Sequence, residues 1–248
     1  MVQQALLSDD YYIPDPNNLI TEDDTPVDNF SSAKQQRLLV SSVYTSAPHQ
    51  TFLAEANVGI YHTANQSAIV PDVFLSLDVQ VPGNWWEKQH RVYLVWHFGK
   101  PPEVVIEIVS NKVGDELGEK LKIYQQMRVS YYIVYDPNCQ LGEQVLLVYE
   151  LRGRRYYETT ETWLEQVGLG LTQWQGKFEG RQDIWLRWCY QDGTVLPTGD
   201  ERAAQAEQLL QQERLEKEQQ EQRAQQAEQR AELLAAQLRA LGVNPEDI

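Results

Sequence analysis

Residues 101–110 read PPEVVIEIVS, and this stretch constrains the fold more than any other part of the chain. Five of its last seven residues are β-branched and apolar, which is typical of a strand buried on both faces of a sheet. Glu107 lies in the middle of this run. A carboxylate in a dry strand costs several kcal/mol unless a partner neutralises it or it takes up a proton. The sequence therefore predicts a central strand that carries a carboxylate with a specific role.

A second strand is predicted in IVPDVFLSLDV, where Pro71 fixes the start. Side chains alternate between the faces of a strand. One face receives Val73, Leu75, Leu77 and Val79, and the other receives Asp72, Phe74, Ser76 and Asp78. In the first strand, Glu107 shares a face with Val105 and Val109. If the two strands are neighbours, the carboxylates of Asp72 and Glu107 meet on one face. They would repel there unless a cation lies between them, and magnesium prefers oxygen ligands of this kind.

The segment GDELGEKLKIYQQM, residues 114–127, is predicted to be a helix. At about 100° per residue, its packing side is predicted to hold Leu117, Leu121, Tyr124 and Arg128. Lys120 lies about 60° to one flank of that side and Lys122 about 140° away, toward water. Lys120 can therefore reach along the sheet. A lysine near a metal-bridged phosphate can hold a water nucleophile or stabilise developing charge.

The remaining pattern indicates an α/β or α+β fold, with a mixed central sheet and helices on at least one face. Apolar residues at helical spacing after Ser31 predict a helix over Ser31–Ala47. Further strands are predicted in FLAEANVGIYH, RVYLVW and YYIVYD, in a hairpin around Arg152-Gly153, and in LGLTQWQGKF and DIWLRWCY.

Composition limits the partners and the compartment. The formal net charge is −15, and residues 1–33 contain seven acidic residues and no Lys or Arg. We expect residues 1–30 to form an irregular acidic arm and residues 31–195 to form the folded domain. No basic stripe announces nucleic-acid binding, so affinity for DNA would need a local patch or a metal ion. Neither a membrane span nor a signal peptide is apparent, and Cys139 and Cys189 have no metal-ligand spacing, so we expect a cytoplasmic protein with free thiols.

Residues 200–241 differ in kind and are predicted to form a long C-terminal helix or coiled coil. Gln, Glu, Ala, Arg and Leu dominate, and RAAQAEQ at Arg202 recurs as RAQQAEQ at Arg223. The predicted heptad seam consists of Ala203, Ala206, Leu210, Ala224, Ala227, Ala231, Leu234, Leu238 and Leu241. Glu213, Lys217 and Gln220 interrupt it. A weak homodimer or a docked coiled-coil partner is favoured over a solvated single helix.

Three linked segments, PDVFLSLDV, PPEVVIEIVS and DELGEKLKIYQQMRVSYYIVYDP, resemble a large bacterial family of restriction-endonuclease-like proteins common in cyanobacteria. That family resembles the PD-(D/E)XK nucleases. The resemblance covers residues 57–137 well and the following hairpins loosely, and the tail is similar to tails in one branch of the family. It implies a restriction-endonuclease-like α/β fold and magnesium- or manganese-dependent hydrolysis of DNA.

The resemblance also implies roles for particular residues. Asp72 and Glu107 would be metal ligands, with the backbone carbonyl of Ile108 as a further one, and Lys120 would be the catalytic lysine. Ser110 and Tyr124 would have supporting roles. The position two after Glu107, where many of these nucleases carry the lysine, is Val109. The superfamily often adds an acidic residue from the first helix, which has none here, so Glu55 and Asp28 are only candidates.

Each of these residues has a simpler interpretation when taken alone. Asp72 could begin a strand, Glu107 could belong to a structural ion pair, and Lys120 could pair with Glu116 on the surface. Order and spacing together favour the nuclease site. Trp85, Trp86 and the Trp163–Trp188 group are interpreted as core and hairpin packing rather than a base-stacking platform. The rival function is a non-catalytic scaffold that acts through the coiled coil, and a third is a nuclease whose basic partner supplies DNA affinity.

Overall fold

The computed structural model describes most of the chain, which forms two compact units, residues 1–196 and 197–248. The described residues are 29–48, 51–63, 67–81, 83–87, 90–111 and 115–240. The predicted arm over residues 1–30 lies outside them except for Asn29 and Phe30. Asn29 accepts a hydrogen bond at Oδ1 from the Ser32 N–H (2.9 Å) and so caps the first helix. No described helix combines the length and the hydropathy that a bilayer span requires.

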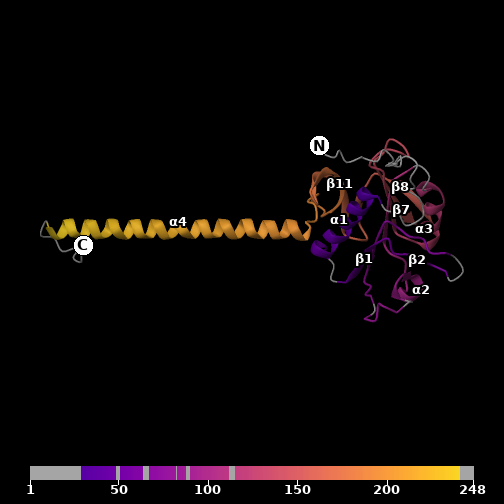
Figure 1. The fold of residues 1–248 in the computed structure, drawn as a ribbon, viewed down its shortest axis with the longest axis horizontal. Helices are drawn as coiled ribbons and strands as arrows, with labels where there is room; N and C mark the ends of the chain where they lie inside the picture. Colours follow the sequence, from indigo (N-terminus) through magenta and orange to yellow (C-terminus); the bar gives the residue numbers. More distant parts are fainter. Residues whose placement is uncertain are drawn as a thin grey trace, which may run out of the picture. The chain divides into compact units, whose positions relative to one another are not determined.

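Within its described residues, the first unit contains a large mixed sheet, two small sheets and several helical segments (Figure 1). Its helices are α1 (Phe30–Ser46), α2 (Val95–Phe98), the π-helical turn η3 (Glu116–Lys120) and α3 (Leu121–Met127). Its strands are β1 (Phe52–Ala56), β2 (Ile60–Tyr61), β3 (Val73–Leu77), β4 (Tyr93–Leu94), β5 (Val104–Ile108), β6 (Tyr131–Tyr135), β7 (Leu146–Arg152), β8 (Arg155–Thr159), β9 (Trp163–Leu164), β10 (Leu169–Phe178) and β11 (Arg181–Cys189).

In the part of the chain that the structure describes, the central sheet has six strands in the order β1-β3-β5-β6-β7-β8. Its β5–β6 pair is parallel and the other neighbours are antiparallel. A parallel pair needs a crossover connection, and η3 with α3 supplies it. β11-β10-β9 form a second sheet, and β2 pairs with β4 in parallel. The predicted α/β class with a mixed central sheet flanked by helices is confirmed.

Both faces of the central strands are buried, as the continuous apolar runs predicted. Val73, Val104 and Ile106 face one core, which α1 and the β9–β11 sheet cover. Phe74, Val105 and Val109 face a second core, which α3 and the β2–β4 region cover. Glu107 lies on the same face as Val105 and Val109, as predicted, because every second side chain of a strand points to the same face of the sheet.

Two local predictions were wrong. Trp85 and Trp86 do not pack in the core: they lie in a loop, and 57% and 78% of their surfaces are exposed. The packing side predicted for the 114–127 segment is correct at Tyr124, which is buried, but wrong at Leu117, which is 41% exposed, and at Arg128, which is exposed at the left-handed end of α3 (φ 71°). The wider η3 turn shifts the phase that an ideal α-helix would have. Trp185 and Trp188, by contrast, are buried as predicted.

The second unit contains α4 (Gly199–Ala240), so the predicted long C-terminal helix is present. Asp200 and Glu201 lie in its first turn and Arg239 in its last, which suits the helix dipole. The Thr198 and Glu201 side chains accept hydrogen bonds from each other's N–H groups, which is a capping box. The structure describes all of Gly199–Ala240, and none of these residues is buried.

The fold predicts that Gln35 of α1 is a structural residue. Its buried amide donates to the Leu186 carbonyl (2.7 Å) and accepts from the Leu186 N–H (3.0 Å), which joins α1 to β11. We expect Gln35→Leu to lower the free energy of unfolding by about 2–4 kcal/mol, because two buried backbone groups lose their partner. Denaturant unfolding measures this. Gln175→Leu, on the exposed side of β10, is the matched control, and an equal effect of both changes would contradict the prediction.

Candidate active site

Glu107 is buried at the end of β5, with 2% of its surface exposed, and both of its carboxylate oxygens are engaged. Oε1 accepts a hydrogen bond from the Tyr124 hydroxyl (2.8 Å), and Oε2 accepts one from Lys120 Nζ (3.1 Å). Lys120 is the last residue of η3 and Tyr124 lies in α3. One carboxylate therefore holds the crossover segment against the sheet.

Asp72 lies beside Glu107 because of the strand register. β3 and β5 are antiparallel with Val73 opposite Ile106, so the next pair of positions along the strands is Asp72 and Glu107. Asp72 Oδ2 accepts from the Ile108 N–H (2.6 Å) and Oδ1 accepts from Gln36 Nε2 (2.7 Å). These two bonds orient the Asp72 carboxylate. The register places it beside Glu107, as alternation along the two strands predicted.

The η3 turn is what delivers Lys120 to Glu107. Asp115 begins the turn in the left-handed conformation (φ 52°) and accepts from the Glu119 N–H (2.8 Å). A Cβ at Gly118 would lie 1.9 Å from Asp115 Oδ1, so a larger residue there would displace the Asp115 carboxylate that caps the turn. The Tyr132 hydroxyl of β6 donates to the Glu116 carbonyl (2.9 Å). π-Helical turns are rare and frequently occur at functional sites.

Glu116 is the site residue whose importance the sequence did not indicate. Its spacing of four residues from Lys120 predicts only an ordinary surface pair. The structure pairs its Oε1 with Lys120 Nζ (3.6 Å) but buries the side chain to 7% exposure. Among the described residues, its Oε2 has no hydrogen-bond partner. Lys120 thus lies between two buried carboxylates, Glu107 and Glu116.

The electrostatics of the site oppose ionisation of Glu107. Burial raises the pKa of Glu107 to about 8, and the negative charge of Asp72 acts in the same direction. Lys120 and the Tyr124 hydroxyl act against this increase. Burial lowers the pKa of Lys120, but the charges of Glu107, Glu116 and Asp72 outweigh it, so that pKa is raised and the ammonium persists.

The other predicted residues contribute less directly. The described hydrogen bond of Ser110 is made by its carbonyl, which accepts from Gln140 Nε2 (2.8 Å). The Ile108 N–H binds Asp72, while Val109 points into the second core. Of the candidate additional acids, Glu55 lies on β1 and lines a separate pocket, and Asp28 lies outside the described residues. The first helix, which has no acidic residue, instead contributes the amide of Gln36 to Asp72.

The donor set suits a hard cation with few protein ligands. Magnesium keeps several waters and binds through one or two carboxylates. Asp72 and Glu107 supply two, and Asp72 is close enough for its charge to raise the pKa of Glu107. Nowhere in the described ranges do three or more His, Cys, Asp or Glu side chains form a group that could hold a metal. Any metal here would therefore rest on this pair of carboxylates, backbone oxygen and water.

Glu107 makes stability depend on pH. Its pKa is 4.5 ordinarily and about 8 in the fold, so between these values the folded chain holds a proton that the unfolded chain has lost. Stability therefore falls as pH rises through this range. We expect the free energy of unfolding of the wild type, in chelator, to fall by about 2–5 kcal/mol relative to Glu107→Gln.

Denaturant unfolding at several pH values across that range measures the difference. Exposed Glu119→Gln is the control and should follow the wild type. Parallel pH dependence of the wild type and Glu107→Gln would contradict the assignment of Glu107.

Comparison with known proteins gives one family. The family model Uma2, described as "Putative restriction endonuclease", matches residues 18–179. No curated protein matches the chain significantly. The matched region is more than half of the chain and contains Asp72, Glu107 and Lys120. The resemblance of the three linked segments is thereby confirmed, and the chain belongs to the Uma2 family of restriction-endonuclease-type proteins.

Proposed function

We propose that this protein is a metal-dependent endonuclease that hydrolyses DNA phosphodiester bonds. The observation that carries the proposal is the convergence of Asp72, Glu107 and Lys120 from three segments at one end of β3 and β5, with Lys120 Nζ 3.1 Å from Glu107 Oε2. Two adjacent carboxylates and a lysine are the groups that phosphodiester hydrolysis with a divalent ion requires. Family membership supports nuclease chemistry in general.

Asp72 and Glu107 would hold magnesium or manganese, with the Ile108 carbonyl as a further ligand. A bound ion would activate water and neutralise charge on the scissile phosphate. Lys120 carries a persistent positive charge beside this position, so it can hold the nucleophilic water or stabilise charge that develops on the phosphate.

Gln36 and Tyr124 are positioning residues in this proposal. Gln36 Nε2 holds Asp72 Oδ1 at 2.7 Å, and the Tyr124 hydroxyl holds Glu107 Oε1 at 2.8 Å. The second carboxylate oxygens, Asp72 Oδ2 and Glu107 Oε2, accept from the Ile108 N–H and from Lys120 Nζ. Ligand carboxylates that are fixed in this way bind metal with little loss of side-chain freedom. A cytoplasmic location is part of the proposal, and the free cysteines Cys139 and Cys189 are compatible with it.

Metal binding and cleavage are expected to depend on different residues. Glu107→Gln should lose saturable magnesium or manganese binding and nicking of plasmid DNA while remaining folded. Lys120→Met should retain metal binding but lose about 10²–10³-fold in nicking rate, because it removes a charge that acts on the transition state. Calorimetric titration and plasmid nicking under the same conditions measure both.

Lys122→Met is the matched control for Lys120→Met. Lys122 is exposed, pairs with Glu119 (2.9 Å), and should be dispensable for nicking. Absence of metal binding in the wild type would overturn the nuclease proposal and leave a nuclease-shaped scaffold. Nicking that survives in Glu107→Gln would remove Glu107 from the mechanism.

The alternative is an interaction protein that acts through α4. The structure describes all of Gly199–Ala240, and no residue of this helix is buried. Even the apolar residues Leu210 and Leu234 of the predicted seam are 49% and 51% exposed. Helices in proteins gain most of their stability by packing an apolar face against a partner. A second copy of this chain, paired along the seam as a coiled coil, would provide that packing.

We expect the full chain to be a weak dimer through this seam. Leu234→Glu together with Leu238→Glu should shift it to monomer, because charges at core heptad positions are costly. Light scattering coupled to size-exclusion chromatography measures the mass. The control is Leu233→Glu, which lies next to the seam but outside it and is 64% exposed. A monomeric wild type at high protein concentration would rule out the homodimer.

A further inference from the structure

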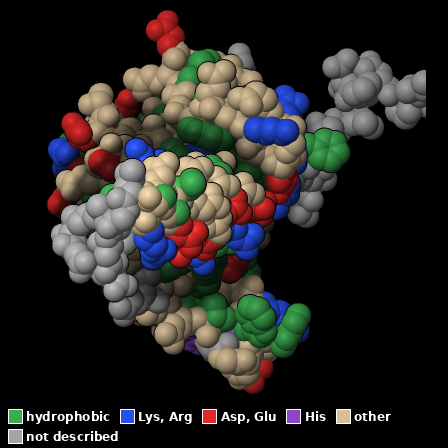
Figure 2. Space-filling view, turned by 90° about the vertical axis from the view of Figure 1, so that its left-hand side faces the viewer, with side chains coloured by type: hydrophobic (Ala, Val, Ile, Leu, Met, Phe, Trp, Pro, Cys, Tyr) green, Lys and Arg blue, Asp and Glu red, His purple; other side chains and the backbone are tan. Residues whose placement is uncertain are grey.

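Two adjacent tryptophans, Trp85 and Trp86, are exposed to an unusual degree beside the second core. Their ring centroids are 6.0 Å apart at an interplanar angle of 72°. Figure 2 shows hydrophobic side chains gathered at the bottom of the view, at the height where Figure 1 places α2, with basic side chains beside them. Exposed apolar patches rimmed by polar groups mark binding sites more often than single exposed residues do.

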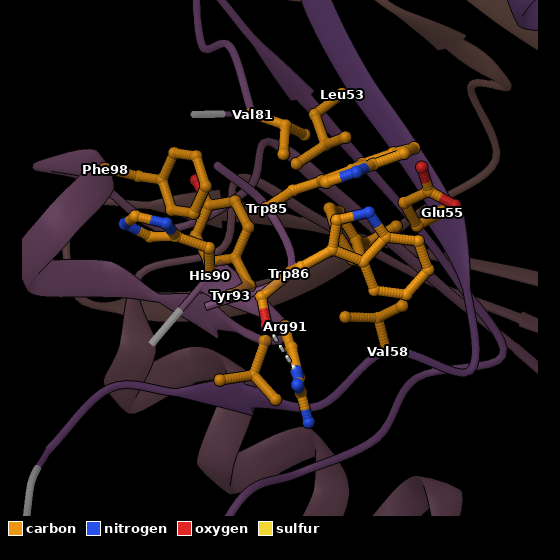
Figure 3. Close-up of a pocket in the computed structure, with 12 residues that line it drawn as sticks. Leu53, Glu55, Val58, Val81, Trp85, Trp86, His90, Arg91, Tyr93 and Phe98 are labelled. Atoms are coloured by element: carbon orange, nitrogen blue, oxygen red, sulfur yellow. Dashed lines mark hydrogen bonds between the residues drawn. The ribbon is translucent and has the colours of Figure 1, made fainter. Parts of the chain in front are cut away.

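The two tryptophans belong to a pocket of about 540 Å³. Figure 3 shows both indoles extending toward Glu55, with Phe98 and Tyr93 at the other end. The rings of Phe98 and Tyr93 are stacked, with centroids 4.3 Å apart and an interplanar angle of 15°. The Arg91 Nε donates to the Trp86 carbonyl (3.0 Å), which ties the guanidinium to the tryptophan loop. The pocket is therefore an aromatic chamber with a few charged groups at its edge.

This combination suits a flat aromatic ligand whose edge carries hydrogen-bonding groups. The indoles offer faces for stacking. Half-buried Glu55 can accept from an amino or imino group, and Arg91 can donate to a carbonyl or phosphate oxygen. A nucleobase has both properties, and bases of every sequence stack on aromatic side chains.

The pocket and the candidate active site share one face of the sheet. Phe74, which lines the pocket, is two positions from Asp72 along β3 and pairs with Val105, two positions from Glu107 along β5. Two positions along a strand span about 7 Å. A base that is unstacked from a strand bound at Asp72 and Glu107 would therefore lie within reach of the pocket.

The charge of the chain gives a separate reason for such a pocket. Asp and Glu number 36 against 21 Lys and Arg. Most affinity for duplex DNA comes from contacts between basic side chains and phosphates, and an acidic protein has little of it. Stacking of an unpaired base supplies affinity that does not depend on charge.

We propose that the pocket lined by Trp85 and Trp86 binds an unpaired nucleobase of the DNA strand that the site at Asp72 and Glu107 cleaves. The inference rests on the proposed nuclease function, and it specifies the substrate as DNA with an unpaired base near the scissile phosphate. Binding in chelator tests it without any need for cleavage.

The experiment is fluorescence anisotropy of labelled DNA with the full chain in chelator. The probes are a short oligothymidine, the same strand with abasic sites, and a duplex of equal length. We expect the oligothymidine to bind at least about 10-fold more tightly than the abasic strand or the duplex, with a shallow dependence on salt. The Trp85→Ala and Trp86→Ala double variant should lose about 5- to 100-fold in oligothymidine affinity.

Trp96→Ala is the matched control, because Trp96 is 48% exposed on α2 but does not line the pocket. It should bind like the wild type, and circular dichroism should show that both variants are folded. The inference is overturned if the abasic strand binds as tightly as the oligothymidine, or if the double variant binds like Trp96→Ala. It is also overturned if thymidine monophosphate competes as well as the strand does, which would indicate a site for free nucleotides. A wild type that binds in this way but, with magnesium or manganese, cleaves neither the oligothymidine nor plasmid DNA would refute the proposed hydrolysis and leave the base site standing.

Discussion

The burial of the Glu107 carboxylate is the interaction on which the organisation of the site depends. Burial of an ionised carboxylate costs several kcal/mol, and the contacts that Lys120 and Tyr124 make from the crossover segment reduce that cost. Their two hydrogen bonds fix η3 and α3 over the end of β5. The same burial raises the pKa of Glu107 to about 8. A cation nearby would favour the ionised form, so the protonation of the residue that anchors the crossover is sensitive to a bound cation. Structural support and proposed chemistry therefore reside in one side chain.

Asp72 is held from the other side of the molecule. Gln36 reaches it from α1, while the neighbouring Gln35 fastens that helix to Leu186 of β11. The first helix thus connects the small sheet to the end of β3. Rigid support of this kind gives a carboxylate pair a defined spacing, which a divalent ion requires. In the proposed function, an acidic chain gains little affinity for DNA from phosphate contacts. Stacking in the aromatic pocket beside β3 would supply affinity that does not depend on charge.

Much of the sheet could be predicted because a strand buried on both faces has a distinctive composition. The alternation that assigned Glu107 to the face of Val105 is correct, and so is the pairing that brings Asp72 beside it. The packing side of the 114–127 helix was wrong at Leu117, since a π-helical turn does not follow the ideal period. The interpretation of Trp85 and Trp86 as core residues was also wrong, because large aromatic residues are buried on average and nothing local marks an exposed loop.

The sequence by itself determined the α/β class, the central strands and the long C-terminal helix, because apolar periodicity is a local property of the chain. It also determined the family, through the resemblance of three linked segments. Only the tertiary structure decided that Glu116 is buried against Lys120 and that Gln36 binds Asp72. The Gln36–Asp72 contact joins residues 36 positions apart, and its partners carry no mark of each other in the sequence. Burial of Glu116 depends on the non-ideal turn that Asp115 and Tyr132 stabilise. Packing between distant segments sets these positions, and local pattern cannot specify it.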